Sequence, residues 1–196
     1  MSKKMVGVLG AAAVVILAAG PALADESLAR AQESRAAIKE FGEALRGKLV
    51  SALESGGPVN AIDVCHSTAA QIAADISQKK GWKVARTSLK ARNPKNAPDA
   101  WEKQVLVKFE KRKAAGEDPA TMEDYAVLSD KKGGKVFRYM KAIPTAEKPC
   151  KTCHGGKLAA DVDAAIKKHY PKDKARGYES GDIRGAFTVT QPVKMQ

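Results

Sequence analysis

Apolar residues recur every three or four positions in four segments of the chain, the spacing of a helix with one buried face. These segments are residues 27–53, 60–79, 98–116 and 161–169. Runs of β-compatible residues predict short strands at residues 83–89, 125–129, 135–143 and 185–193. We therefore expect an α+β fold, with a long N-terminal helix and with helices on one side of a few antiparallel strands.

Glycine and proline mark the ends of these elements. Gly56, Gly57 and Pro58 end the first helix, and Gly81 ends the second. Residues 130–134 carry two glycines and predict the turn of a hairpin. Residues 90–97 and 144–156 lack regular spacing and are predicted to be irregular. The chain is about long enough for one hydrophobic core, so residues 25–196 are expected to form a single domain.

The first 24 residues have the three parts of a secretory signal peptide. Lys3 and Lys4 form a positive start, residues 6–19 are apolar, and residues 22–24 (Ala-Leu-Ala) form a small-residue cleavage site. The apolar run is short for a membrane-spanning helix and is soon followed by Pro21. We expect cleavage after Ala24 and no membrane span in the mature chain. An uncleaved N-terminal anchor is the alternative.

The chain is strongly basic, with a formal net charge of +12. Loss of residues 1–24 removes Lys3 and Lys4 and no acid, which leaves +10. Such a charge suits nucleic acid, an anionic membrane or an acidic protein partner. Export argues against nucleic acid, and no nucleic-acid-binding motif is present. We expect the basic surface to attract an acidic redox partner. The alternative is a solvated basic surface that has no specific partner.

Residues 150–154 read Cys-Lys-Thr-Cys-His, the attachment motif of c-type haem. Cys150 and Cys153 are spaced to form thioethers with the two vinyl groups of one porphyrin, and His154 would then be the proximal iron ligand. A zinc site would need a second pair of ligands, and a thioredoxin-like site would need a βαβ context. We therefore predict one covalent haem c, which agrees with an exported, periplasmic protein.

Several residues could supply the sixth iron ligand. Cys65 lies in the middle of an apolar stripe along the helix at residues 60–79, and His66 lies about 100° further round that helix. Cys65 is also the odd cysteine of an exported protein, although free cysteines often act as small buried hydrophobes. The other candidates are Met122, Met140, His169, Met195 and an open position, with Met140 more typical of a core residue.

Basic residues near the third helix suggest contacts with the haem propionates. Arg86, Lys90 and Arg92 carry the charge for this role, and arginine has the matching geometry. Their alternative role is surface solvation. Asp182 and Arg184 are interpreted as a structural pair or as turn residues.

Several separated motifs, in order, give the chain a family resemblance. It resembles the photosystem-associated c-type haem proteins with a PAS-like fold, which also occur as extracytoplasmic haem input domains of bacterial sensors. The resemblance covers nearly all of the mature chain and rests on residues 61–65, 86–90, 92–98, 101–102, 149–155, 177–178 and 181–186. It implies a PAS-like antiparallel sheet with flanking helices, and it implies that Cys65 is the sixth ligand. We expect no kinase or cyclase module of the kind that the sensor members carry.

The expected function is one-electron transfer or redox sensing by a periplasmic monohaem protein. The alternative is a module that responds to diatomic gas or redox state, in which Cys65 leaves the iron on reduction. A haem peroxidase is a third hypothesis. It would need an open iron site and a distal acid–base group, for which only His66 is suitable, so we expect no enzymatic activity.

Overall fold

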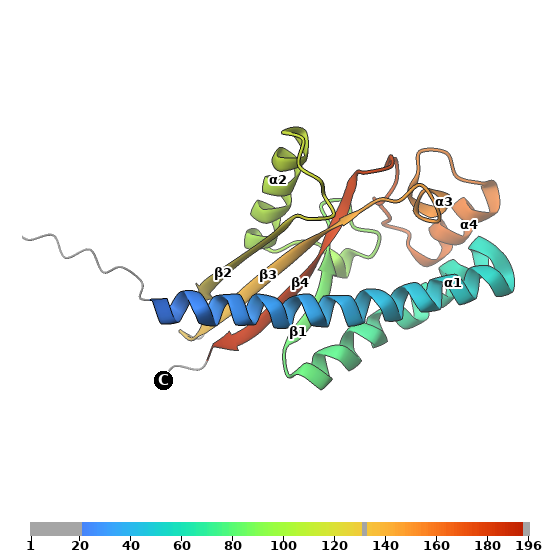
Figure 1. Ribbon diagram of the computed structural model, residues 1–196. Helices are drawn as coiled ribbons and strands as arrows, with labels where there is room; N and C mark the ends of the chain where they lie inside the picture. Colours follow the sequence, from blue (N-terminus) through green and yellow to red (C-terminus); the bar gives the residue numbers. More distant parts are fainter. Residues whose placement is uncertain (1–20, 131–132, 194–196) are drawn as a thin grey trace, which may run out of the picture.

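A four-stranded antiparallel sheet forms the centre of the computed structural model, which describes residues 21–130 and 133–193. Its strands are β1 (Lys83–Thr87), β2 (Glu123–Ser129), β3 (Lys135–Pro144) and β4 (Ile183–Val193). They are arranged in the order β1-β4-β3-β2, so β3 and β4 lie in the middle (Figure 1). β2 and β3 are the predicted hairpin, although residues 131–132 of its turn lie outside the described residues.

The longest helical element, α1 (Pro21–Lys80), is two helical arms joined by a kink. Gly56 and Gly57 have non-helical backbone angles, and Gly57 has a φ of 71°, which glycine adopts without steric cost. The second arm doubles back beside the first and leads into β1 (Figure 1). The other helices are α2 (Ala100–Ala114), α3 (Cys150–His154) and α4 (Ala160–His169), and η1 (Pro94–Asn96) is a 3-10 turn.

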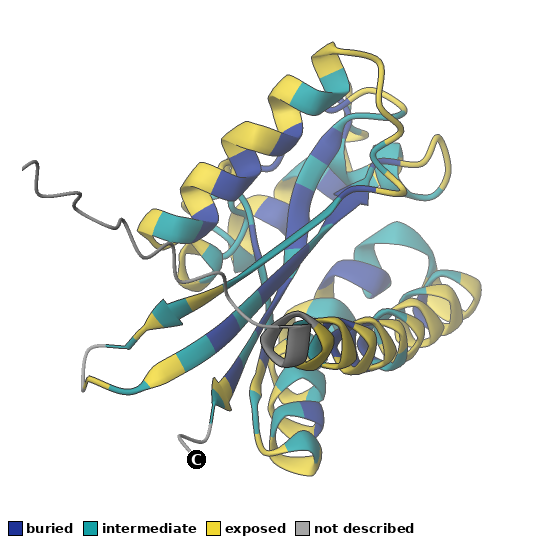
Figure 2. Ribbon diagram, turned by 60° about the vertical axis from the view of Figure 1, so that its left-hand side comes forward, coloured by how far each residue is buried: buried dark blue, intermediate teal, exposed yellow. Residues whose placement is uncertain are grey.

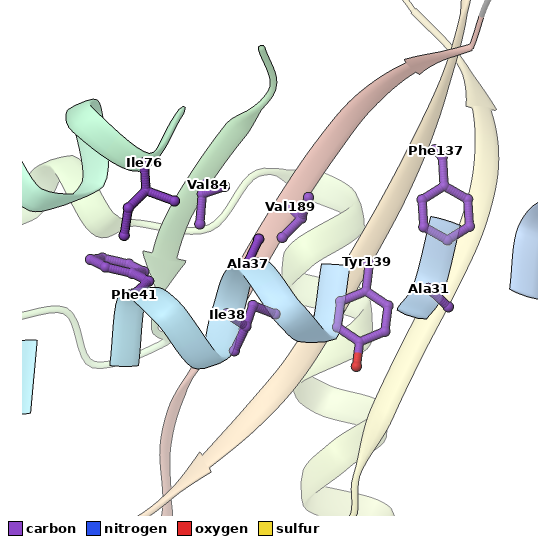
Figure 3. Close-up of a cluster of buried hydrophobic side chains, with 9 residues drawn as sticks. All are labelled: Ala31, Ala37, Ile38, Phe41, Ile76, Val84, Phe137, Tyr139 and Val189. Atoms are coloured by element: carbon purple, nitrogen blue, oxygen red, sulfur yellow. The ribbon is translucent and has the colours of Figure 1, made fainter. Parts of the chain in front are cut away.

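Helices cover both faces of the sheet. Side chains of a strand point alternately to its two faces, so Phe137 and Tyr139 of β3 meet α1, whereas Met140 meets α2. Figure 3 shows the cluster on the α1 face. The sheet lies between α2 and the two arms of α1 (Figure 2). The α+β class is therefore confirmed, and the expectation that all helices lie on one side is wrong.

The haem motif lies in a helix, contrary to the prediction of an irregular segment. α3 is only five residues long and follows Pro149, so no apolar periodicity could reveal it. Beyond the sheet, α4 packs against the second arm of α1 through Ile62, Val162 and Ile166. Among the described helices, none combines the length and apolar character needed to cross a bilayer. Residues 1–20 of the predicted signal peptide and Met195 lie outside the described residues.

Gly185 is expected to be essential for the junction of β1 and β4. Its φ is 152°, and a Cβ atom there would lie 2.5 Å from the carbonyl oxygen of Thr87. Gly185→Ala should therefore lower the free energy of unfolding by about 2 kcal/mol or more. Gly47 is the matched control, because it is helical and no atom lies within 4 Å of a Cβ built there. Gly47→Ala should raise the stability by about 0.5–1 kcal/mol. Urea denaturation measures both, and equal effects would contradict the expectation.

Candidate haem-binding site

α3 presents the two thiols of the motif together. Cys150 and Cys153 are three residues apart, which places their side chains on the same side of one helical turn. Both are free and partly exposed. The backbone around them is fixed from both sides, because Gly155 N donates to Lys151 O (3.0 Å) and Tyr178 N donates to His154 O (3.0 Å). The arrangement suits attachment of both thiols to one rigid partner.

His154 is held in the orientation of an iron ligand. Its Nδ1 lies 3.0 Å from the carbonyl oxygen of Ala175, so Nδ1 carries the proton and donates it. Burial lowers the pKa of His154 to about 3, and the positive charges of Arg92 and Arg184 contribute to this shift. The ring is therefore neutral, and Nε2 keeps its lone pair. This is how metal-binding histidines are commonly oriented by a carbonyl group.

Arg92 links α3 to the loop that contains Ala175. Its Nε donates to Asp173 Oδ1 (3.0 Å), and its Nη2 donates to the carbonyl oxygens of Ala175 (3.1 Å) and Cys153. Asp173 Oδ1 also accepts from Ala175 N (3.0 Å). Burial opposes the charge of Asp173, but Arg92 and these hydrogen bonds hold the pKa of its carboxyl below its usual value. The ion pair therefore positions the acceptor of His154.

Cys65 and His66 lie on different sides of the second arm of α1. Burial raises the pKa of the Cys65 thiol, and the charges of Arg86 and Arg92 partly offset this effect. Cys65 is also close enough to Cys153 to affect the pKa of that thiol. His66 is exposed, and its ring lies against His169 (centroids 4.8 Å apart) and Tyr170 (5.0 Å). Of the two, Cys65 is the one beside the haem motif.

The remaining candidates for the sixth ligand are engaged elsewhere. Met122 and Met140 are fully buried in the cluster between the sheet and α2, so Met140 is a core residue as predicted. His169 Nε2 lies 2.5 Å from Asp63 Oδ1, at the contact of α4 with α1.

Two arginines near the motif have no carboxylate partner among the described residues. Burial lowers the pKa of Arg86, and the charge of Arg184 lowers it further. Burial is also the main cause that lowers the pKa of Arg184, whose side chain lies beside Cys150. The Nε atom of Arg184 is buried and has no hydrogen-bond partner. Partly buried cations that lack a carboxylate partner within the described ranges fit a bound group that carries carboxylates.

The structure corrects the predicted pairing of Asp182 with Arg184. Asp182 instead pairs with Lys113 and accepts a hydrogen bond from Glu179 N (2.7 Å). The alternation of side chains is interrupted at the start of β4. Ile183 and Ala186 are three residues apart and should point to opposite faces, yet both pack on the α2 face. The irregularity at Gly185, together with the register shift between Ala142 and Pro144, therefore turns Arg184 away from the α2 face.

The three predicted propionate contacts differ in their surroundings. Arg86 is partly buried and interacts electrostatically with Cys65, whereas Arg92 donates hydrogen bonds to three acceptors. The Lys90 Nζ donates to Arg176 O and lies 4.4 Å from the centroid of the Tyr178 ring. The guanidinium of Arg86 lies 5.8 Å from the centroid of the Phe41 ring and has no carboxylate partner in the described part of the chain.

Together these residues fit a haem c. The fit rests on two adjacent thiols, a neutral histidine, a cysteine on the opposite helix, and two arginines for which residues 21–130 and 133–193 supply no carboxylate partner. This donor set matches the two thioethers, two axial positions and two propionates of the group.

Comparisons with known proteins also support a haem-binding site. Residues 23–192 match the model of a family described as Tll0287-like. The structure is similar to the crystal structure of the cyanobacterial heme-protein Tll0287, with 26% sequence identity and a TM-score of 0.61. The similarity covers 91% of this chain and 99% of that protein. No curated protein sequence matches the chain.

Proposed function

This chain belongs to the Tll0287-like family, and from that premise we propose that it is a periplasmic protein with one covalent haem c. The observation that carries the proposal is the fixed His154 ring beside two free thiols. The heme-protein Tll0287, whose fold the chain shares, supports it. When bound, the haem supplies a one-electron couple, so the proposed role is electron transfer or redox sensing.

Each residue of the site has a role in this proposal. Cys150 and Cys153 hold the haem through thioethers, and His154 binds the iron through Nε2. Cys65 supplies the sixth ligand from α1, since the family resemblance and its position beside Cys153 agree. Arg86 would neutralise propionate charge, because it has no carboxylate of its own among the described residues. His66 is the alternative sixth ligand.

The test is the mass of the protein after expression with a cytochrome c maturation system. We expect the mass of residues 25–196 plus one haem, and we expect the haem to remain after acid–acetone extraction. Haem that is lost on extraction, or a mass without it, would overturn the proposal. The same measurement tests cleavage after Ala24.

An exchangeable Cys65 would make the protein a sensor of diatomic gas or redox state. The observation that favours this alternative is the desolvation of Cys65, which raises the pKa of its thiol and so disfavours the thiolate form once it is off the iron. Carbon monoxide titration of the dithionite-reduced protein separates the two roles. We expect a Soret shift if Cys65 leaves on reduction. An unchanged spectrum at saturating gas would favour electron transfer.

We propose no enzymatic activity. A peroxidase would need a distal acid–base group, and the one suitable candidate, His66, lies against His169 and Tyr170. Peroxide turnover well above that of free haem would contradict this proposal.

An acidic protein is the proposed redox partner. Residues 25–80 carry seven basic and eight acidic residues, whereas residues 81–196 carry 25 basic and 14 acidic ones. Lys95, Lys172 and Lys174 are exposed on the two loops that adjoin the haem motif, and within the described ranges none has an ion-pair partner. Reaction with an anionic oxidant should therefore slow as salt is added. A rate that does not depend on salt would count against this partner class.

A further inference from the structure

One carbonyl oxygen, that of Ala175, accepts from both His154 and Arg92. The distances are 3.0 Å to His154 Nδ1 and 3.1 Å to Arg92 Nη2. We propose that Arg92 is a positioning residue that acts through this shared carbonyl, weakens the electron donation of His154 to the iron and raises the reduction potential of the haem. The inference rests on the proposed haem c and adds a residue that regulates it.

The hydrogen bonds of Arg92 hold its side chain in one position. Its guanidinium has acceptors on three sides, which are the Asp173 carboxylate and the carbonyls of Cys153 and Ala175. The side chain of Arg92 is 15% exposed and that of Asp173 is 2% exposed. Asp173 is fixed in turn by Ala175 N and by Arg176 Nε (2.6 Å). A planar, rigid guanidinium can satisfy all three acceptors at once, whereas an ammonium group cannot do so with the same geometry.

The direction of the effect follows from the shared acceptor. A hydrogen bond from the outer nitrogen of a ligating histidine makes the ligand more basic, and a more basic ligand stabilises ferric iron. The charged guanidinium draws electron density from the Ala175 oxygen and occupies one of its lone pairs, so the bond from His154 is weaker than an unshared one. The positive charge of Arg92 also disfavours the more positive ferric state. Both effects raise the potential.

Asp173 should act in the opposite sense. Its carboxylate neutralises part of the charge of Arg92 and competes with the Ala175 oxygen for the guanidinium. Removal of that negative charge leaves Arg92 more strongly positive beside the motif. Loss of Arg92 should therefore lower the potential, and loss of the Asp173 charge should raise it. A pair that only holds the loop in place would not produce opposite signs.

The test compares the reduction potentials of haem-loaded Arg92→Gln and Asp173→Asn with that of the unmodified protein. We expect the equilibrium constant for reduction to fall about tenfold in Arg92→Gln, which is 59 mV for a one-electron couple. It should rise several-fold in Asp173→Asn. Arg92→Lys keeps the charge without the three-way geometry and should fall between Arg92→Gln and the unmodified protein. Lys103→Gln removes an exposed cation of α2, outside the candidate haem site, and it should change the constant less than twofold.

The outcomes separate this inference from the proposed function. Each variant is first shown by mass to carry covalent haem, and its thermal unfolding is recorded beside the potential. Variants that carry haem with unchanged potentials, or with shifts of the same sign, would overturn the role of Arg92 and leave the haem protein intact. If Arg92→Gln does not fold, the sign of the Asp173→Asn shift decides. Unmodified protein without covalent haem would instead overturn the function itself.

Discussion

Cys150→Ala combined with Cys153→Ala is expected to abolish covalent haem attachment completely. The two thiols share one side of α3, and the other described cysteine, Cys65, lies on a different helix. Without them, no sulfur in α3 is left to form a thioether. The measurement is the mass of the protein and the haem that stays with it in acid–acetone. We expect neither haem mass nor retained haem in the double variant.

The single variants and Cys65→Ala are the matched controls for this experiment. Each single variant keeps one thiol of α3 and should hold some haem through one thioether. Cys65→Ala should hold a full complement, because Cys65 belongs to the opposite helix and is predicted to bind the iron rather than the porphyrin. Covalent haem in the double variant at the level of the unmodified protein would contradict the assignment of the motif.

The helices and strands with a clear residue pattern could be predicted from the sequence. The way in which they pack against one another was harder to predict. The β-compatible residues at 135–143 predicted a strand, and the structure confirms it as β3, with Phe137 and Met140 on opposite faces. The apolar stripe of residues 98–116 predicted α2. A stripe shows that a helix has a buried face, but it does not show which face of a sheet it covers. The placement of α2 opposite α1 was therefore missed.

Part of the candidate site could be predicted from neighbouring residues in the sequence, whereas the rest depends on contacts between distant segments. Cys150, Cys153 and His154 are one short motif, so their chemistry is visible in the sequence. Arg184 was missed because the irregularity at Gly185 breaks the alternation that would place it on the α2 face. The acceptor of His154 is a backbone carbonyl, for which no side chain gives a signal. The pair of Arg92 and Asp173 joins residues 81 positions apart, which only the folded chain reveals.

Cys65→Ser is expected to change the ferric spectrum and to raise the reduction potential strongly, whereas His66→Ala should leave both nearly unchanged. Cys65 lies beside the haem motif, and a thiolate there would stabilise ferric iron through its negative charge. Axial ligands set haem potentials over a range of ≈ 0.8 V, so the loss of an anionic ligand should shift the reduction constant at least a hundredfold, or roughly 120 mV. His66 is the matched control on the same helix, because its ring lies against His169 and Tyr170 instead.

Ferric-state electron paramagnetic resonance and a redox titration measure the two effects together. The resonance spectrum of low-spin haem with thiolate and imidazole ligands differs in anisotropy from that of haem with two imidazoles. The spectrum of the unmodified protein therefore already distinguishes Cys65 from His66 as the sixth ligand. We expect the thiolate signal to be lost in Cys65→Ser and kept in His66→Ala. If His66→Ala converts the spectrum while Cys65→Ser does not, then the iron has two histidine ligands and the assignment of Cys65 is wrong. The contacts of His66 with His169 and Tyr170 would then have to open for its ring to reach the iron.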